Sequence, residues 1–355
     1  MELALTESRP AVDIVVTNHD YGRFLRDAID SALGQQYDRL RVIVVNDGST
    51  DDSREVIASY TGRIEAVLKE NGGQASALNA ALAHVRGDVV IFLDADDMLA
   101  PAAAARVAAR FAEKPALAKV QFRLQVASED GIPTGELKPP AHVALLSGDL
   151  GPRTLRFPFD VPWAFGGTAF RAAVLRELAP IPEDGRVGAD WYLVHVASLH
   201  GPVGAIDEPL GVYRVHASNA HEAGPPLDLG RLRDTIGHTA RARGYLERAA
   251  VQLGLPWDPR DASLAEVGDR AISLKLDPAG HPQPGDTRLG LVVLGARAAA
   301  RRWDVRLPFK IAFVAWLLAL TVSPRPLARR LGEAFVFPER RRFLDRPLAA
   351  LHRER

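Results

Sequence analysis

Three carboxylates follow one apolar run, and their type and spacing suit the binding of a metal ion. Asp94, Asp96 and Asp97 come directly after residues 89–93, a run typical of a buried strand in a parallel sheet. Burying like charges would cost several kcal/mol each, so the acids must emerge at the carboxyl end of that strand. Carboxylate oxygens at such an edge suit Mg²⁺ or Mn²⁺ carrying a diphosphate. The alternative is an acidic helix start, because Pro101 follows and suits a first helical turn.

Two earlier segments have the same construction of strand, polar turn and helix. Residues 12–17 and 41–45 read as strands, and polar turns follow at 18–22 and 46–53. An Asp-Gly pair in the second turn is often only a hairpin. The residues after it carry helix N-cap signals, which favours strand, turn and helix. Both turns are therefore expected to connect a strand to a helix, as the acidic turn does.

A third strand is expected over residues 64–68, with a polar turn at 69–74 and a helix behind it. Four strands thus alternate with helices in about the first 115 residues, which predicts an α/β fold with a mostly parallel sheet flanked by helices. Because parallel strands end at one edge, Asp47 is expected at the same edge as Asp94 and Asp96.

These motifs together resemble those of family-2 glycosyltransferases, which have the GT-A (Rossmann-like) fold. They span residues 12–101 in the expected order, and the resemblance implies an inverting transferase that uses a nucleotide-diphospho sugar and usually a divalent metal, Mn²⁺ or Mg²⁺. The matching segments are Val-Val-Thr-Asn-His-Asp at 15–20, Val-Val-Asn-Asp-Gly-Ser-Thr-Asp-Asp-Ser at 44–53, Glu-Asn-Gly-Gly-Gln-Ala-Ser-Ala-Leu-Asn at 70–79 and Phe-Leu-Asp-Ala-Asp-Asp at 92–97.

The same resemblance implies roles for individual residues. Asp96 corresponds to the metal ligand of the DXD motif, with Asp94 close by, and His216 is similar to the histidine that reaches back to the metal. A structural role for His216 is the alternative. The residues expected to contact the nucleotide sugar are Thr17, Asn18, Asp47, Asn71, Gly72, Gly73, Asn79, Asp94, Ala95 and Asp96.

The second half of the domain should supply the acceptor side. Asp190 and Trp191 match the last two letters of the family's acid-Asp-Trp motif, while Ala189 stands in the first position. Asp190 is therefore the predicted catalytic base, and a helix cap is the alternative. Gly166 and Gly167, together with Trp191, are expected on the acceptor side, where a backbone could approach a ligand closely; an ordinary turn is the other interpretation.

Composition sets the outer bounds. The chain has 355 residues, of which 47% are hydrophobic and none is cysteine, so disulfides and thiolate metal sites are excluded. The first residues carry neither a basic segment nor an apolar run, so we expect no signal peptide and a cytoplasmic location. We predict a GT-A domain over residues 1–222 and a mainly helical extension over 223–355.

The C-terminal region is basic and contains one apolar run. From residue 297 to 355 there are 14 Lys/Arg and 5 Asp/Glu, and residues 311–322 are mostly apolar. This run is too short to span a bilayer, which needs about 20 residues. With Trp303 and Trp316 at headgroup depth, it would lie on an anionic membrane surface, peripheral to the inner face of the cell membrane. The alternative is a core helix with a solvated basic face.

The leading functional hypothesis is glycosyl transfer, in bacterial synthesis of polysaccharide, lipopolysaccharide or glycolipid. The donor is expected to carry UDP, and the acceptor to be a saccharide or a lipid-linked molecule such as a polyprenyl phosphate. We expect no nucleic-acid partner. Two alternatives are a sugar nucleotidyltransferase and a non-catalytic nucleotide-sugar-binding protein. The first usually needs a glycine-rich basic loop after the first strand, and residues 18–22 do not form one.

Overall fold

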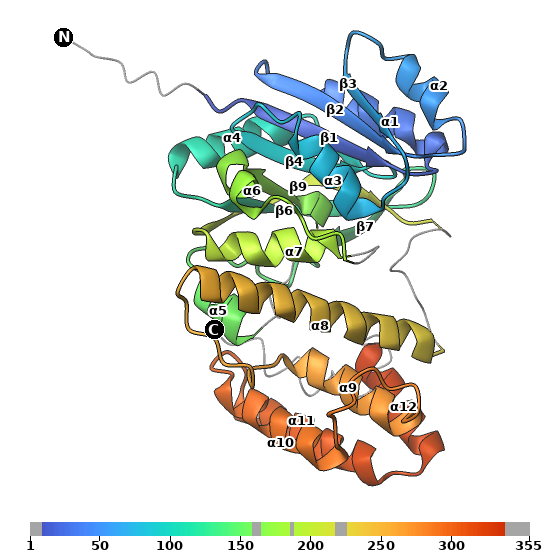
Figure 1. Cartoon of the computed structure of the whole chain (residues 1–355), viewed down its shortest axis with the longest axis vertical. Coiled ribbons are helices and arrows are strands. Elements are labelled where there is room, and N and C mark those ends of the chain that lie inside the picture. Colours follow the sequence, from blue (N-terminus) through green and yellow to red (C-terminus); the bar gives the residue numbers. More distant parts are fainter. Residues whose placement is uncertain (1–8, 158–164, 185–187, 217–225, 338–355) are drawn as a thin grey trace, which may run out of the picture. The chain divides into compact units, whose positions relative to one another are not determined.

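The computed structural model describes residues 9–157, 165–184, 188–216 and 226–337. The chain divides into two compact units (Figure 1). Unit 1 comprises residues 1–154, 161–219 and 248–253; unit 2 comprises residues 155–160, 220–247 and 254–355. The predicted boundary after residue 222 lies outside the described residues, so that division stays a prediction.

Unit 1 contains one mixed sheet in the order β3-β2-β1-β4-β8-β6-β9-β5, with β7 paired to β6. The first four strands in this order are mutually parallel, and β8 joins them in the antiparallel sense. The predicted mostly parallel α/β sheet is therefore confirmed. The strands are β1 (Val12–Asn18), β2 (Leu40–Asp47), β3 (Glu65–Lys69), β4 (Val89–Asp94), β5 (Met98–Leu99), β6 (Lys119–Ala127), β7 (Pro133–Lys138), β8 (Thr168–Arg171) and β9 (Val203–Arg214).

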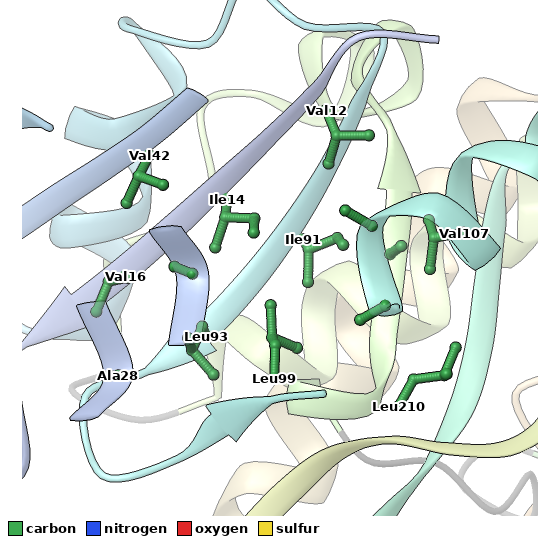
Figure 2. Packing of buried hydrophobic residues seen from close by; sticks show 14 of the residues in the cluster. Val12, Ile14, Val16, Ala28, Val42, Ile91, Leu93, Leu99, Val107 and Leu210 are labelled. Atoms are coloured by element: carbon green, nitrogen blue, oxygen red, sulfur yellow. The ribbon is translucent and has the colours of Figure 1, made fainter. Parts of the chain in front are cut away.

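Helices cover the sheet because its central strands are apolar on both faces. Alternate residues of β1 and β4, such as Ile14 and Ile91, point toward α1 and α4, where Ala28 and Val107 meet them (Figure 2). The helices of this unit have apolar residues at helical spacing on the buried side. They are α1 (Gly22–Leu33), α2 (Ser53–Ala58), α3 (Gln74–Leu82), α4 (Ala103–Glu113), α6 (Ala172–Leu178) and α7 (Ala189–Val196), with 3₁₀ turns at Phe165–Gly167 and Ala197–Leu199.

Unit 2 is helical. A Ser263 side chain accepts a hydrogen bond from the backbone N–H of Glu266 and so caps α9, and Thr287 caps α10 in the same way. The core of the unit includes Val267, Ile272 and Leu317. Its helices are α9 (Leu264–Leu276), α10 (Arg288–Arg301), α11 (Leu307–Val322) and α12 (Arg325–Val336); α8 (Leu229–Gln252) and the short α5 (Gly151–Arg156) contribute residues to both units. The predicted helical C-terminal region is confirmed.

The apolar run of the C-terminal region lies in α11. Within the described part of the chain, no helix combines the length and the apolar character that crossing a bilayer requires. Trp316 packs inside unit 2: its ring stacks on Phe335 and its indole N–H donates to the Leu331 carbonyl. The structure therefore differs from the prediction that Trp316 meets lipid headgroups.

Candidate functional site

The candidate site lies at the carboxyl ends of the parallel strands of unit 1. The crossover direction reverses between β1 and β4, which is where open α/β sheets bind ligands. Thr17 and Asp94 pair across these two strands, and the Thr17 hydroxyl donates to Asp94 Oδ1 at 3.4 Å. Asp47 ends β2 on the other side of β1. The predicted shared edge of Asp47 and Asp94 is present, with one strand between them.

Three further carboxylates, those of Asp96, Asp97 and Asp190, interact electrostatically with Asp94. Burial raises the pKa of Asp94 to about 7, helped by the negative charges of Asp96 and Asp190, while the Thr17 hydrogen bond lowers it. Burial, Asp96 and Asp94 likewise raise the pKa of Asp97 well above its ordinary value. Asp190 is 96 residues from Asp94 along the chain. The fold therefore brings the predicted base to the predicted metal-binding pair.

His216 follows β9 and reaches the same cluster. Its Nε2 lies 3.0 Å from Asp96 Oδ2, and its ring stacks on Phe24 with 4.8 Å between centroids. Tyr21 completes the aromatic wall, and its pKa is raised by burial and then by Asp96 and Asp94. Among the described residues, no group of three or more His, Cys, Asp or Glu is arranged to hold a metal ion.

Asp97 is the third acid of the run, and the sequence alone indicated no role of its own for it. It is 5% exposed, and its Oδ1 accepts the backbone N–H of Arg214 at 3.0 Å. Gly166 faces its other oxygen: a Cβ added there would lie 3.3 Å from Asp97 Oδ2. The only sequence signal for this arrangement is a third acid directly after the DXD motif. Gly167 stands beside Gly166 in a buried 3₁₀ turn.

The Asp47 carboxylate is held by the loop that follows β3. It accepts from Lys69 Nζ at 2.6 Å, from the Gly72 N–H at 3.0 Å and from the Gly73 N–H at 2.8 Å. Gly73 has a φ of 83°, a conformation that side chains with a Cβ rarely adopt. A carboxylate has about four acceptor positions, so a nucleoside would share Asp47 with this loop. Lys69 was not predicted as part of the site.

The predicted asparagines make hydrogen bonds within the protein. Asn18 is buried and donates to Asn46 Oδ1 and Ser49 Oγ, and the Asn71 amide lies 3.0 Å from the His19 ring. Asn79 accepts from the Ile181 N–H and donates to the Ile181 carbonyl and to Glu183. Asn79 therefore ties α3 to the segment before α7. Ala95 is also buried, and its N–H donates to the Thr17 carbonyl.

Helix α7 carries the candidate base in its first turn. Gly188, with a φ of 116°, precedes the helix, and Asp190 Oδ1 accepts the Trp191 N–H at 2.8 Å. The other end of α7 is fixed by Lys119, which is buried in β6 and donates from Nζ to the Val194 carbonyl at 2.6 Å. Burial lowers the pKa of Lys119 to about 7. A capping role and a catalytic role for Asp190 are both compatible with this geometry.

Comparisons with known proteins fit this architecture. An uncharacterized glycosyltransferase of Nostoc sp. is 31% identical over 220 residues, which is 59% of this chain and 66% of that protein. Two uncharacterized glycosyltransferases of Rickettsia are 40% identical over 92 residues, which is 26% of this chain and 29% of each of those proteins.

Two solved structures have similar folds. A mannosyltransferase from Pyrobaculum calidifontis, in complex with GDP-Man and Mn²⁺, has a TM-score of 0.50 at 20% identity, covering 96% of this chain and 88% of that one. Residues 1–349 of S. aureus TarS in complex with UDP have a TM-score of 0.51 at 15% identity, covering 90% and 91%. At these identities the likeness shows the fold.

The family itself follows from the sequence match. The model of "Glycosyl transferase family 2" matches residues 13–177, which include β1 to β4 and the DXD motif. The match agrees with the sheet order and with the position of the acidic cluster. The chain belongs to glycosyl transferase family 2, with a GT-A fold.

Proposed function

We propose that this protein is an inverting glycosyltransferase that transfers a sugar from a nucleotide-diphospho sugar to an acceptor hydroxyl. One observation carries the proposal: the Asp190 carboxylate lies close enough to Asp94 to help raise its pKa, at the ligand-binding edge of a family-2 sheet. A single-displacement transfer needs a base for the acceptor and positive charge for the leaving diphosphate. The cluster offers both a base and a place for that charge.

Asp190 is the proposed base. It lies in the first turn of α7, and its Oδ1 accepts the backbone N–H of Trp191. An acceptor hydroxyl within hydrogen-bond distance would give its proton to Asp190 as its oxygen attacks the anomeric carbon. Lys119 and Asn79 fix the two sides of the segment that carries this residue. Trp191, Gly166 and Gly167 are the proposed neighbours of the acceptor.

Asp96 and His216 are the proposed protein ligands of a divalent cation, with Asp94 close by. Oxygen and imidazole donors suit Mn²⁺, and the surplus of negative charge that raises the pKa of Asp94 and Asp97 is what a cation would offset. When bound, the cation would stabilise the charge that develops on the leaving diphosphate. The rest of its ligands would come from phosphate and water, as is common for ions that carry diphosphates.

The proposed donor is a nucleoside diphosphate sugar whose nucleoside lies near Thr17, Asp47 and the loop at 70–73. Structures of similar fold hold UDP in one case and GDP-Man in the other, so both bases must be tried. The proposed acceptor is a saccharide or lipid-linked saccharide of the cell surface.

Release of nucleoside diphosphate tests the proposal. The full-length protein is incubated with UDP-sugars and GDP-sugars, Mn²⁺ and mixed acceptors, and free UDP or GDP is measured. We expect release with one nucleotide, dependent on Mn²⁺ and lowered by about 100-fold or more in Asp190→Asn. Asp130→Asn, at an exposed site of the same unit, is the matched control and should leave release unchanged. Tight binding of a nucleotide sugar without any release would support a binding protein instead.

A further inference from the structure

The exposed side of α11 is apolar along its whole length. Leu307, Ile311, Leu318 and Val322 are 67%, 61%, 50% and 81% exposed, and we call these four residues the apolar face. The other exposed residues of the helix are Pro308 and three alanines. At 3.6 residues per turn, all eight fall within one arc of about 140°.

The remaining residues of α11 pack in unit 2 or form hydrogen bonds there. Phe313, Leu317 and Leu320 are buried in the core of unit 2. The two polar side chains bond to nearby carbonyls, Lys310 to Ala300 and Thr321 to Leu317. An ordinary surface helix presents polar residues to water and apolar ones to the core. Because α11 is apolar on both sides, its exposed side is suited to an apolar partner.

Positive charge surrounds this helix. Residues 287–332 contain nine Lys/Arg. Four of them pair with acids of unit 2, namely Arg297, Arg301, Arg302 and Arg329. The other five are Arg288, Arg306, Lys310, Arg325 and Arg330. Arg306 directly precedes α11, and Arg325 opens the next helix. Loss of solvent, followed by the charges of Arg288 and Arg325, lowers the pKa of Lys275, so several cations gather near the start of α12. Both ends of the apolar face are thus bracketed by cations.

We propose that the apolar face of α11 docks onto an anionic lipid bilayer, with the helix lying in the plane of the interface. The four apolar side chains enter the boundary between headgroups and acyl chains, and Arg306 and Arg325 meet lipid phosphates at the two ends. A helix of 16 residues is about 24 Å long, shorter than the hydrocarbon thickness of about 30 Å, so it lies along the surface. This inference goes beyond the proposed transfer reaction and does not depend on it.

Vesicle co-sedimentation of the full-length protein tests the apolar half of the proposal. Phosphatidylcholine vesicles are used with and without phosphatidylglycerol. We expect binding to the anionic vesicles, and Ile311→Gln/Leu318→Gln should lower the partition coefficient by more than about tenfold. The control, Ile132→Gln/Val251→Gln, removes similarly exposed apolar side chains, 65% and 71% exposed, from unit 1 and should bind as wild type.

Arginine substitutions and changes in salt concentration test the electrostatic part of the proposal. Arg306→Gln/Arg325→Gln should weaken binding roughly 30-fold, about fivefold for each cation, and binding should fall between about 0.1 M and about 1 M salt. Lys114→Gln/Arg176→Gln, at exposed sites of unit 1, is the control. If wild type stays in the supernatant with anionic vesicles at low salt, the proposal is wrong.

The oligomeric state gives the remaining outcome. A wild-type dimer that becomes monomeric in Ile311→Gln/Leu318→Gln, without any vesicle binding, would show that a second copy covers the face, and would overturn the proposal. The melting temperature of that variant should match wild type, because its two side chains are exposed. If the variant has a lower melting temperature, vesicle binding of Arg306→Gln/Arg325→Gln is used instead, because these arginines lie outside the core. Weaker binding of that variant supports lipid docking, and unchanged binding contradicts it.

Discussion

Replacing Lys119 by methionine should change how stability depends on pH. Lys119 is 2% exposed, and burial lowers its pKa from 10.5 to about 7. Between these values the folded protein binds fewer protons than the unfolded chain, so the free energy of unfolding rises with pH across this window. Each pKa unit corresponds to about 1.4 kcal/mol. Between about pH 7 and about pH 9, the free energy of unfolding of the wild type should therefore rise by roughly 2 kcal/mol relative to that of Lys119→Met.

Urea denaturation of both proteins at several pH values measures this difference. At about pH 6 the variant should be the more stable protein, because the wild type must keep a charged amine in its core. The stability advantage of the variant should shrink as pH rises, because the amine of Lys119 then becomes neutral and keeps its hydrogen bond to the Val194 carbonyl. Lys114→Met, at an exposed lysine, is the control and should run parallel to wild type. Parallel curves for Lys119→Met as well would refute the reasoning.

Three further substitutions test the site. Asp190→Asn should lower kcat by about 100-fold or more with donor affinity retained in calorimetry; a lower melting temperature with normal kcat would indicate a cap instead. Asp47→Asn weakens the charge-assisted hydrogen bonds from Lys69 and the following loop, so thermal unfolding should show a free energy of unfolding lower by about 1–3 kcal/mol. The same variant should have a higher KM for the donor. Gly73→Ala should cost about 1–2 kcal/mol because of its positive φ, whereas Gly285→Ala, in open space, should be neutral; equal melting temperatures would contradict this.

The strands and the shared edge were predictable because they depend on local patterns. Apolar runs ending in polar turns located β1, β2 and β4, and parallel pairing then required Asp47 and Asp94 to share an edge. Strand order was not readable, so the position of β1 between those two acids came only from the structure. The approach of Asp190 to Asp94 came only from the structure, and the role of Asp190 as the base stays a prediction.

Contacts between distant residues were not predictable. Nothing local indicates that Asp97 accepts the Arg214 N–H, 117 residues away, or that Lys69 pairs with Asp47. The packing of Trp316 was not predictable for the same reason. Sequence alone suggested headgroup depth for Trp316, yet it stacks on Phe335, because hydropathy does not say which side of an apolar helix is already covered.

Two arginines of the basic C-terminal region are ion-paired within the same unit. Arg301 pairs with Asp258 and Asp261, and Arg302 pairs with Asp304. These cations are used inside unit 2. The charges that remain for a lipid surface had to be identified from the structure.

Binding of nucleotide to Asp96→Asn tests the central claim most directly. Calorimetry is carried out with UDP and GDP, with and without Mn²⁺, on wild type and variant. Removing one of the like charges that raise the pKa of Asp94 and Asp97 should leave the melting temperature unchanged or higher. We predict that the variant nonetheless loses the Mn²⁺-dependent part of nucleotide affinity, by at least about tenfold. Unchanged affinity in the presence of Mn²⁺ would contradict the assignment of this acidic cluster as the nucleotide-sugar site.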